Sequence, residues 1–271
     1  MMRRTIPTLI AVALLGFYLF PIYWMYATSF KTLTEAVQYP PTLWPSEPQF
    51  HHAEVFQKFS VARYFVNSIV ITLGVTAITV VVGTGTAYAL ALRRNLFVDL
   101  ILFTILLLQA LPASLMVTPL FVLFNMAGLL NTPRFAVVLA VAAKSLPFFI
   151  VICRTAFLQI PRELRDAALV DGNSNVGVFF NIALPLARNS IVVTAVLIAI
   201  QTMGEYVYSR SFIAKIELQP LTLGLSNFIG AQQTDWIGIM TFASILVTPI
   251  LIVFIFLQRR IISGLTAGAL K

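Results

Sequence analysis

Residues Tyr64–Leu92 read YFVNSIVITLGVTAITVVVGTGTAYALAL, a run of 29 residues without an Asp, Glu, Lys or Arg. A helix rises about 1.5 Å per residue, so this run is long enough to cross a hydrocarbon layer of about 30 Å. Within it, Gly83, Ala87 and Ala91 recur every four residues, which predicts close packing against another helix. The run therefore indicates a membrane-spanning helix with a closely packed face.

The rest of the chain has the same apolar character. Of its 271 residues, 59% are hydrophobic and 10% are charged, which excludes an ordinary soluble domain. Six apolar segments can be recognised, at residues 6–28, 64–92, 97–124, 135–157, 190–212 and 236–257. The expected fold is an all-α integral membrane protein with six transmembrane helices in a single domain over residues 1–271.

The distribution of Lys and Arg over the connections predicts the orientation. One side holds eleven of them, Arg3, Arg4, Arg93, Arg94, Arg154, Arg162, Arg165, Arg188, Arg259, Arg260 and Lys271. The other side holds six, Lys31, Lys58, Arg63, Arg134, Arg210 and Lys215. Cytoplasmic loops are enriched in Lys and Arg, so both termini are expected in the cytoplasm. No basic stripe or cluster is present in the sequence, which disfavours nucleic-acid binding.

The cytoplasmic connection 158–189 differs from the other connections. From Pro161 it reads PRELRDAALVDGNSNVGVFFNIALPLARN. Pro161 suits a first helical position, and the charged residues that follow lie on one side of a short helix. Gly172 then permits a turn. We therefore expect a short amphipathic helix that ends at an elbow.

A second helix is expected after the elbow. Asn173 or Ser174 can cap its beginning, and Pro185 is expected to end it before the next span. The product is a small helix–turn–helix at the membrane surface. Physical reasoning alone leaves an ordinary amphipathic loop on the bilayer as the alternative.

The residues of this connection resemble the EAA motif of the permease subunits of bacterial ABC importers. The resemblance rests on Asp166-Ala167-Ala168, on Gly172 and on Ile182 with Leu184-Pro185, in that spacing. Asp166 replaces the usual Glu, which keeps the charge and shortens the carboxylate arm by one methylene. The ending QRRIISGLTAGALK at residues 258–271 is similar to the tail of the shorter, maltose-type sugar permease. The chain thus resembles the carbohydrate branch of that family.

The resemblance implies an assembly in the bacterial inner membrane. It contains a second permease subunit as a heterodimeric partner, two cytoplasmic ATPase subunits and an extracytoplasmic solute-binding protein, within membrane lipid. ATP and Mg²⁺ would bind the ATPase subunits, and this chain would bind no cofactor or metal. The sequence agrees, because it has no GxxxxGK[ST] motif and Cys153 is its single cysteine. The chain is expected to be a transport subunit and not an enzyme.

By the same resemblance, Pro161–Gly172 would be the coupling helix, which sits in a groove on one ATPase subunit. The residues expected to serve this contact are Glu163, Asp166, Ala167, Ala168, Asp171, Gly172, Leu184 and Pro185. The tail 258–271 would run along the ATPase interface.

Two charged residues, Lys144 and Glu205, fall inside predicted spans at similar depth. Lys144 lies about ten residues, or ~15 Å, from the outer end of its span, where an isolated charge is costly. Gln109 and Gln201 lie at comparable depths. Lys144 and Glu205 are expected either to form a structural ion pair or to line the solute pathway with the two glutamines. A paired Lys144 suits a neutral sugar, and an unpaired one suits an anionic solute such as a sugar phosphate or glycerol phosphate.

The sequence favours the permease of an ATP-driven importer for a sugar or small polyol. The main alternative is an ion-coupled secondary transporter in which Lys144 and Glu205 form a coupling relay. The EAA-like connection argues against it, because a self-contained carrier needs no ATPase dock. An integral membrane enzyme is disfavoured because the sequence contains no convergent catalytic set.

Overall fold

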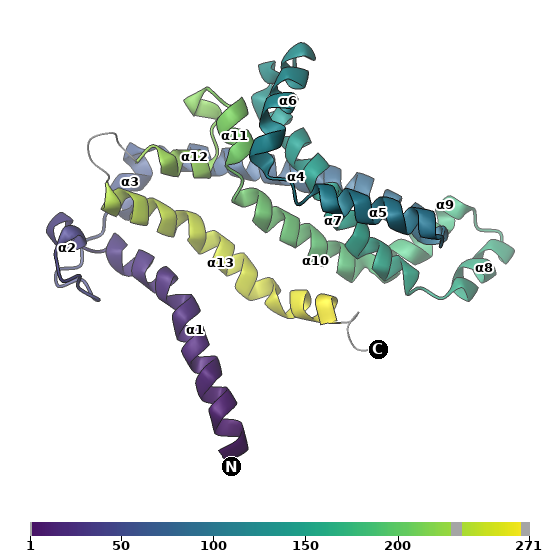
Figure 1. The fold of residues 1–271 in the computed structure, drawn as a ribbon, viewed down its shortest axis with the longest axis horizontal. Coiled ribbons are helices and arrows are strands. Elements are labelled where there is room, and N and C mark those ends of the chain that lie inside the picture. Colours follow the sequence, from purple (N-terminus) through teal and green to yellow (C-terminus); the bar gives the residue numbers. More distant parts are fainter. Residues whose placement is uncertain (1, 229–234, 267–271) are drawn as a thin grey trace. The chain divides into compact units, whose positions relative to one another are not determined.

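The structure, a computed structural model, describes residues 2–228 and 235–266 (Figure 1). Its described residues form helices and their connections, without a strand among them. The α-helices are α1 (Met2–Ser29), α2 (Leu33–Val37), α3 (His52–Lys58), α4 (Val61–Leu92), α5 (Leu96–Leu108), α6 (Ala113–Met126), α7 (Pro133–Leu158), α8 (Arg162–Val170), α9 (Asn175–Val178), α10 (Leu184–Met203), α11 (Val207–Phe212), α12 (Leu221–Ser226) and α13 (Trp236–Thr266). Two short 3-10 turns, η1 (Leu129–Asn131) and η3 (Ile216–Leu218), and one π-helical turn, η2 (Phe179–Ala183), complete the described part.

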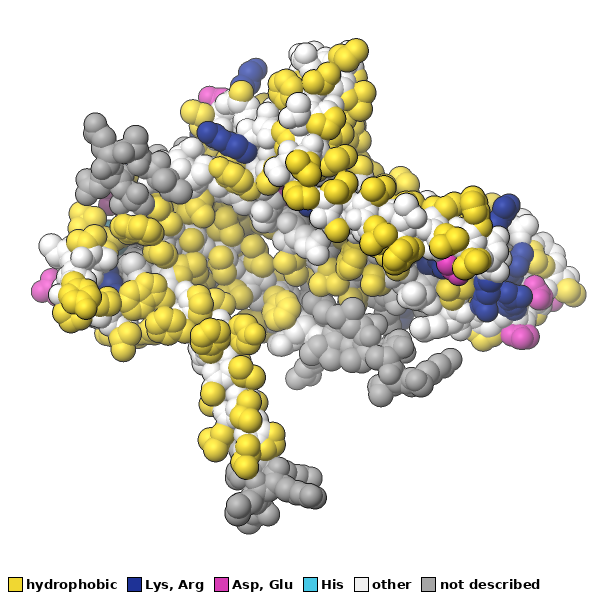
Figure 2. Space-filling model, in the orientation of Figure 1, with side chains coloured by type: hydrophobic (Ala, Val, Ile, Leu, Met, Phe, Trp, Pro, Cys, Tyr) yellow, Lys and Arg dark blue, Asp and Glu magenta, His cyan; other side chains and the backbone are white. Residues whose placement is uncertain are grey.

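Several of these helices can cross a membrane. Five are long and apolar enough, at Ile6–Ser29, Val61–Leu92, Pro133–Leu158, Asn175–Met203 and Trp236–Phe256. The bent pair of α5 and α6 makes a sixth candidate if it counts as one span. Hydrophobic side chains cover much of the face shown in Figure 2, as expected for surfaces that contact lipid or a membrane partner.

The predicted span 97–124 is wrong as a single helix. The chain turns by 96° between α5 and α6, and the two helices point in different directions in Figure 1. Pro112 causes the break, because it has no amide hydrogen to donate to α5 and disfavours helical geometry in the residue before it. Its own ψ of 134° is extended, and α6 begins directly after it.

The predicted span 190–212 is wrong at both ends. The helix begins at Asn175 and ends at Met203. Pro185 was expected to end the helix after the elbow, but it lies in the first turn of α10, which follows η2 without interruption. We attribute this continuity to η2, because a π-helical turn shifts the hydrogen-bond register just before the proline. The break predicted at Pro185, between the second helix of this connection and the next span, is therefore absent.

The described chain falls into two compact units. The first combines the segment up to Phe65 with Leu223–Ile252, and the second combines Val66–Thr222 with the segment from Val253. Each unit is defined by the contacts within it. A single domain over residues 1–271 and a cytoplasmic location of both termini therefore stay predictions.

The second unit has its core between α4, α7 and α10. Phe149 of α7 and Ala87 of α4 are fully buried in it. Gly83 lies directly against Phe149, so that a Cβ atom on this glycine would collide with the aromatic ring. The small-residue face of α4 therefore packs closely, as its four-residue spacing predicts.

The first unit is held by aromatic contacts and contains a buried lysine. Phe242 of α13 contacts Phe228 and Tyr64, with ring centroids 5.4 and 6.3 Å apart. Lys31, which follows α1, is 1% exposed, and its Nζ donates to the carbonyl of Thr42 at 2.5 Å. Burial lowers the pKa of the Lys31 ammonium, and the nearby Glu35 carboxylate opposes this shift. The connection after α1 is therefore an ordered element.

Candidate functional site

The short helix α8 forms a defined element between the long helices α7 and α10. It ends in a Schellman motif, in which the amide of Asn173 donates to the carbonyl of Ala168 at 2.9 Å. The amide of Gly172 donates to the carbonyl of Leu169 at 3.2 Å. Gly172 has a φ of +89°, a left-handed conformation that favours glycine. The elbow expected at Gly172 is thus present, and its direction is set by this backbone geometry.

Ser174 caps the helix that follows the elbow. Its Oγ accepts a hydrogen bond from the amide of Gly177 at 3.0 Å. Of the two capping residues that the sequence offers, the structure uses Ser174. The Schellman motif and the Ser174 cap leave only a few residues between α8 and α9. They therefore hold α8 close to the beginning of the long helix Asn175–Met203.

The residues predicted to contact an ATPase are only partly gathered in α8. Glu163, Asp166 and Ala167 are exposed on α8, Asp171 and Gly172 are exposed directly after it, and Ala168 is buried at 5% exposure. Leu184 and Pro185 lie on α10. Leu184 packs against the core, and Pro185 is exposed. Lys, Arg, Asp and Glu side chains gather at the end of the second unit where α8 lies (Figure 2).

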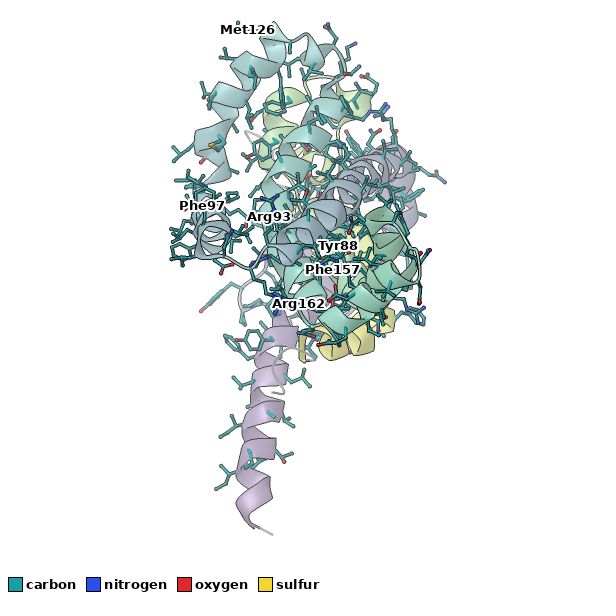
Figure 3. All side chains as sticks on the ribbon, turned by 90° about the vertical axis from the view of Figure 1, so that its right-hand side faces the viewer. Tyr88, Arg93, Phe97, Met126, Phe157 and Arg162 are labelled. Atoms are coloured by element: carbon teal, nitrogen blue, oxygen red, sulfur yellow. The ribbon has the colours of Figure 1, made fainter. Side chains whose placement is uncertain are left out.

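A pocket of about 200 Å³, here called the loop pocket, lies beside α8. It is lined by Tyr88, Ala91, Leu92, Arg94, Phe157, Ile160, Pro161, Arg162, Arg165, Asp166, Val178, Ile182 and Ala183. Figure 3 shows Tyr88, Phe157 and Arg162 grouped at this end of the second unit. Of the predicted residues, only Asp166 lines it. The sequence pattern places Arg162 and Arg165 on the charged side of the predicted short helix and Arg94 only in the charge count, and it does not indicate that the three lie together.

A second pocket of about 380 Å³, here called the central pocket, lies where α10 ends and α5 bends into α6. It brings together all four residues predicted for the solute pathway, Gln109, Lys144, Gln201 and Glu205. Ala113, Val141, Ser145, Phe148, Thr202, Gly204, Tyr206, Val207 and Tyr208 complete its lining. The Gln109 amide donates a hydrogen bond to the carbonyl of Lys144, which joins two of the four directly.

Glu205 is engaged by the helix that follows it. Its carboxylate accepts from the amides of Tyr208 at 2.7 Å and Ser209 at 3.0 Å. The Ser209 hydroxyl donates a third hydrogen bond to it at 2.5 Å. These bonds cap α11, whose N-terminus favours a negative charge. The sequence pattern does not indicate this role, because the apolar run 190–212 predicts a continuous span, whereas the helix ends at Met203, before Glu205.

Lys144 and Glu205 do not form an ion pair in the structure. Within the described part of the chain, the ion pair shorter than 4.0 Å is Arg154–Asp99, at 2.8 Å. The Lys144 side chain is exposed toward the central pocket, and it also lines a second, more apolar pocket between α5, α6 and α7. The expected ion pair is therefore absent from the described structure, and a role of Lys144 in a solute pathway stays a prediction.

The central pocket suits a polar, hydroxyl-rich ligand. Gln109, Gln201 and Ser145 supply hydrogen-bond donors and acceptors, and Lys144 supplies a positive charge. Phe148 and Tyr206 supply aromatic surface. The pocket contributed by one chain falls within the size range of small-molecule sites. No group of three or more His, Cys, Asp or Glu side chains that could hold a metal ion occurs among the described residues.

Part of the predicted tail lies outside the described residues. The helix α13 ends at Thr266, and residues 267–271 of the tail 258–271 are not described. Its expected role at an ATPase interface stays a prediction.

Comparisons with known proteins agree with this architecture. Residues 80–266 match the model of the family described as "Binding-protein-dependent transport system inner membrane component". The chain is 32% identical over 257 residues to a probable ABC transporter permease of Bacillus subtilis, covering 93% of this chain and 83% of that protein. It is 30% identical over 254 residues to the sulfoquinovosyl glycerol transport system permease of Agrobacterium fabrum, covering 93% and 89%.

A solved structure has a similar fold. It is a bacterial ABC transporter that imports the acidic polysaccharide alginate. The superposition has a TM-score of 0.76 at 20% identity and covers 94% of this chain and 96% of the other.

Proposed function

Because the chain belongs to the family of binding-protein-dependent transport system inner membrane components, we propose that it is a permease of an ATP-driven importer for a sugar or small polyol. The observation that carries the proposal is the structured, charged element α8, which lies inside the matched region 80–266. In this role the chain is a transport subunit of the bacterial inner membrane with both termini in the cytoplasm.

The proposed partners are those of a complete importer. A second permease subunit would complete the translocation pathway, and two ATPase subunits would bind ATP and Mg²⁺. An extracytoplasmic binding protein would deliver the solute. The family description supports the binding protein, because its members belong to binding-protein-dependent systems.

Coupling would act through α8. The exposed carboxylates of Glu163 and Asp166 on α8, and of Asp171 directly after it, suit charge or capping contacts in an ATPase groove. The Schellman motif and the Ser174 cap hold α8 in one geometry. Closure of the ATPase dimer around ATP would therefore move α8 as a rigid piece and switch the spans between inward-facing and outward-facing states.

Solute would pass through the central pocket. The amides of Gln109 and Gln201 suit the hydroxyl groups of a carbohydrate, and the aromatic ring of Phe148 suits its apolar face. The central pocket lies beside the bend between α5 and α6. Broken helices commonly form transporter binding sites, because they place free backbone groups and side chains at the same depth.

A second candidate within this class is an importer for an anionic solute, such as a sugar phosphate or glycerol phosphate. The observation that favours it is Lys144, which lines the central pocket without an ion-pair partner in the described structure. Glu205 does not cancel this charge by a direct contact, because its carboxylate caps α11. An anion on the solute would compensate the ammonium during passage.

The ion-coupled alternative has less support. It needs Lys144 and Glu205 as a relay, whereas the Glu205 carboxylate is held by three hydrogen bonds at α11. The ion-coupled alternative also assigns no function to α8.

The proposal can be tested on the complex that copurifies with this chain. It would be placed in lipid discs with its binding protein, and ATP hydrolysis would be measured with neutral sugars, sugar phosphates and glycerol phosphate. We expect ATPase subunits in the complex and stimulation by one class. A phosphate-bearing stimulant would favour the second candidate. Absence of both a copurified ATPase and any stimulation would reject the importer function.

A further inference from the structure

The loop pocket lies where two apolar helices end. Leu92, the last residue of α4, lines it, and so does Phe157, next to the last residue of α7. Tyr88 is also in the lining, and its ring contacts that of Phe157 with centroids 5.4 Å apart. Aromatic residues are enriched at the depth of lipid headgroups, and spans end near the same depth. The lining of the loop pocket thus suits a position near the membrane–water interface.

Three arginines line this pocket without a carboxylate within 4.0 Å of their nitrogens in the described structure. They are Arg94, which donates to the carbonyl of Leu158 at 3.0 Å, Arg162 and Arg165. The Nε of Arg165 is buried and has no hydrogen-bond partner among the described residues. An unpaired buried donor is costly, so the guanidinium group of Arg165 favours an external acceptor, and Arg94 and Arg162 add positive charge beside it.

Arg154 lies at the same end of the unit and, unlike these arginines, has a carboxylate partner. Its guanidinium pairs with Asp99 at 2.8 Å and donates to the carbonyl of Leu90 at 3.2 Å. Asp166 also lines the loop pocket but forms no comparable pair with its arginines. The positive charge of the pocket therefore exceeds its negative charge.

From this arrangement we propose that the loop pocket binds the phosphate of an anionic phospholipid headgroup. A phosphate offers several acceptor oxygens to guanidinium groups that converge on one space. Basic pockets beside membrane helices on the cytoplasmic side are suited to such headgroups. The inference rests on the proposed function in one respect, because the cytoplasmic leaflet is assigned by that proposal.

A lipid fits the walls of the pocket better than free inorganic phosphate does. Leu92, Ile160 and Ile182 give it an apolar side, which a free ion would leave uncovered. The neighbouring helix α5 exposes large hydrophobic residues, including Phe97 at 70% exposure, on the side shown in Figure 3. Acyl chains can therefore cover apolar surface while the headgroup phosphate reaches the arginines.

The test is native mass spectrometry of the whole importer complex released from lipid discs that contain phosphatidylglycerol and phosphatidylcholine. The wild-type complex is expected to retain phosphatidylglycerol. Retention should fall about fivefold for each arginine removed in Arg94→Gln and Arg165→Gln, and further in the double variant. Equal retention by the double variant and the wild type would overturn the proposal.

Arg93→Gln is the matched control. Arg93 is the neighbour of Arg94 in the chain but does not line the loop pocket, so that its removal lowers the net charge equally and should leave retention unchanged. The pair Arg94→Lys and Arg165→Lys keeps the charge and should retain more lipid than the glutamine variants. A uniform loss in all variants, Arg93→Gln included, would contradict a specific site.

A second arm separates the two sources of phosphate. The complex in discs of phosphatidylcholine alone would be titrated with inorganic phosphate. It would then be titrated with phosphatidylglycerol. Binding of inorganic phosphate without preference for phosphatidylglycerol would overturn the lipid assignment. Because lipid retention needs no transport, its failure would leave the importer function intact, and failure of ATP-driven uptake would leave the lipid site intact.

Discussion

The central pocket and the loop pocket both lie in the second unit, and residues of α7 line both. The two pockets differ in the number and surroundings of their positively charged side chains. The central pocket contains one lysine among amides, hydroxyls and aromatic rings, whereas the loop pocket gathers three arginines at the ends of two spans. A lone charge at membrane depth is more costly than a cluster at the interface, where headgroups and water compensate it. The first arrangement suits a transient solute, and the second suits a permanent anion.

Gly172→Val should have the largest effect, because it disturbs the elbow beside the loop pocket. Valine is β-branched and disfavours the φ of +89° at this position, at a cost of about 1–3 kcal/mol of backbone strain. We expect the complex to assemble and hydrolyse ATP while solute uptake is lost. Uptake and ATP hydrolysis would be measured in the same proteoliposomes.

Two controls accompany this variant. Gly172→Asn should keep most of the uptake, because asparagine tolerates the left-handed conformation. Gly85→Val adds the same side chain in α4, where a Cβ meets no atom within 4 Å, and should be tolerated. Normal uptake in Gly172→Val would remove the elbow from the coupling mechanism.

Lys144→Gln tests the central pocket and should rank second. If the solute is anionic, loss of the ammonium should weaken its stimulation of ATP hydrolysis about 10- to 100-fold, the range expected for a hydrogen bond to a charged group. Lys144→Arg keeps the charge and should retain part of the effect. An unchanged dose response in Lys144→Gln would assign the pathway to neutral solutes and exclude direct contact with Lys144.

Gly83→Leu tests the close packing of α4 against α7 in the core of the second unit. The added side chain would collide with Phe149, so the free energy of unfolding should fall by about 1–3 kcal/mol. Thermal unfolding in lipid discs would measure the loss. Gly16→Leu, where a Cβ meets no atom within 4 Å, should leave the transition unchanged. An equal transition temperature for Gly83→Leu would contradict the close α4–α7 contact.

Glu205→Ala should have the smallest effect. It removes the cap of α11, which should lower the free energy of unfolding by about 1 kcal/mol. Thermal unfolding in lipid discs would measure this loss, and among the described residues Glu205 forms no ion pair with Lys144. The charge exchange Lys144→Glu with Glu205→Lys should therefore rescue neither single variant. A clear rescue would show that the two side chains pair.

Some of these features could be predicted from the sequence and others could not. The four central-pocket residues were found because each is a polar side chain inside an apolar run. The elbow was found because glycine after an amphipathic segment has a local meaning. The loop pocket was missed because Arg94 lies on the connection after α4, whereas Arg162 and Arg165 lie on α8, and no local pattern links them.

The apolar, helical character of the chain and the positions of most of its long helices can be predicted from the amino-acid sequence alone. These properties depend on the hydrophobicity and length of single segments, which are local. The 96° bend before α6, the continuous helix through Pro185 and the absence of a Lys144–Glu205 ion pair among the described residues became known only from the three-dimensional structure. Such outcomes depend on helix breaks and on contacts between residues far apart in the chain, because packing selects among conformations that the local sequence allows.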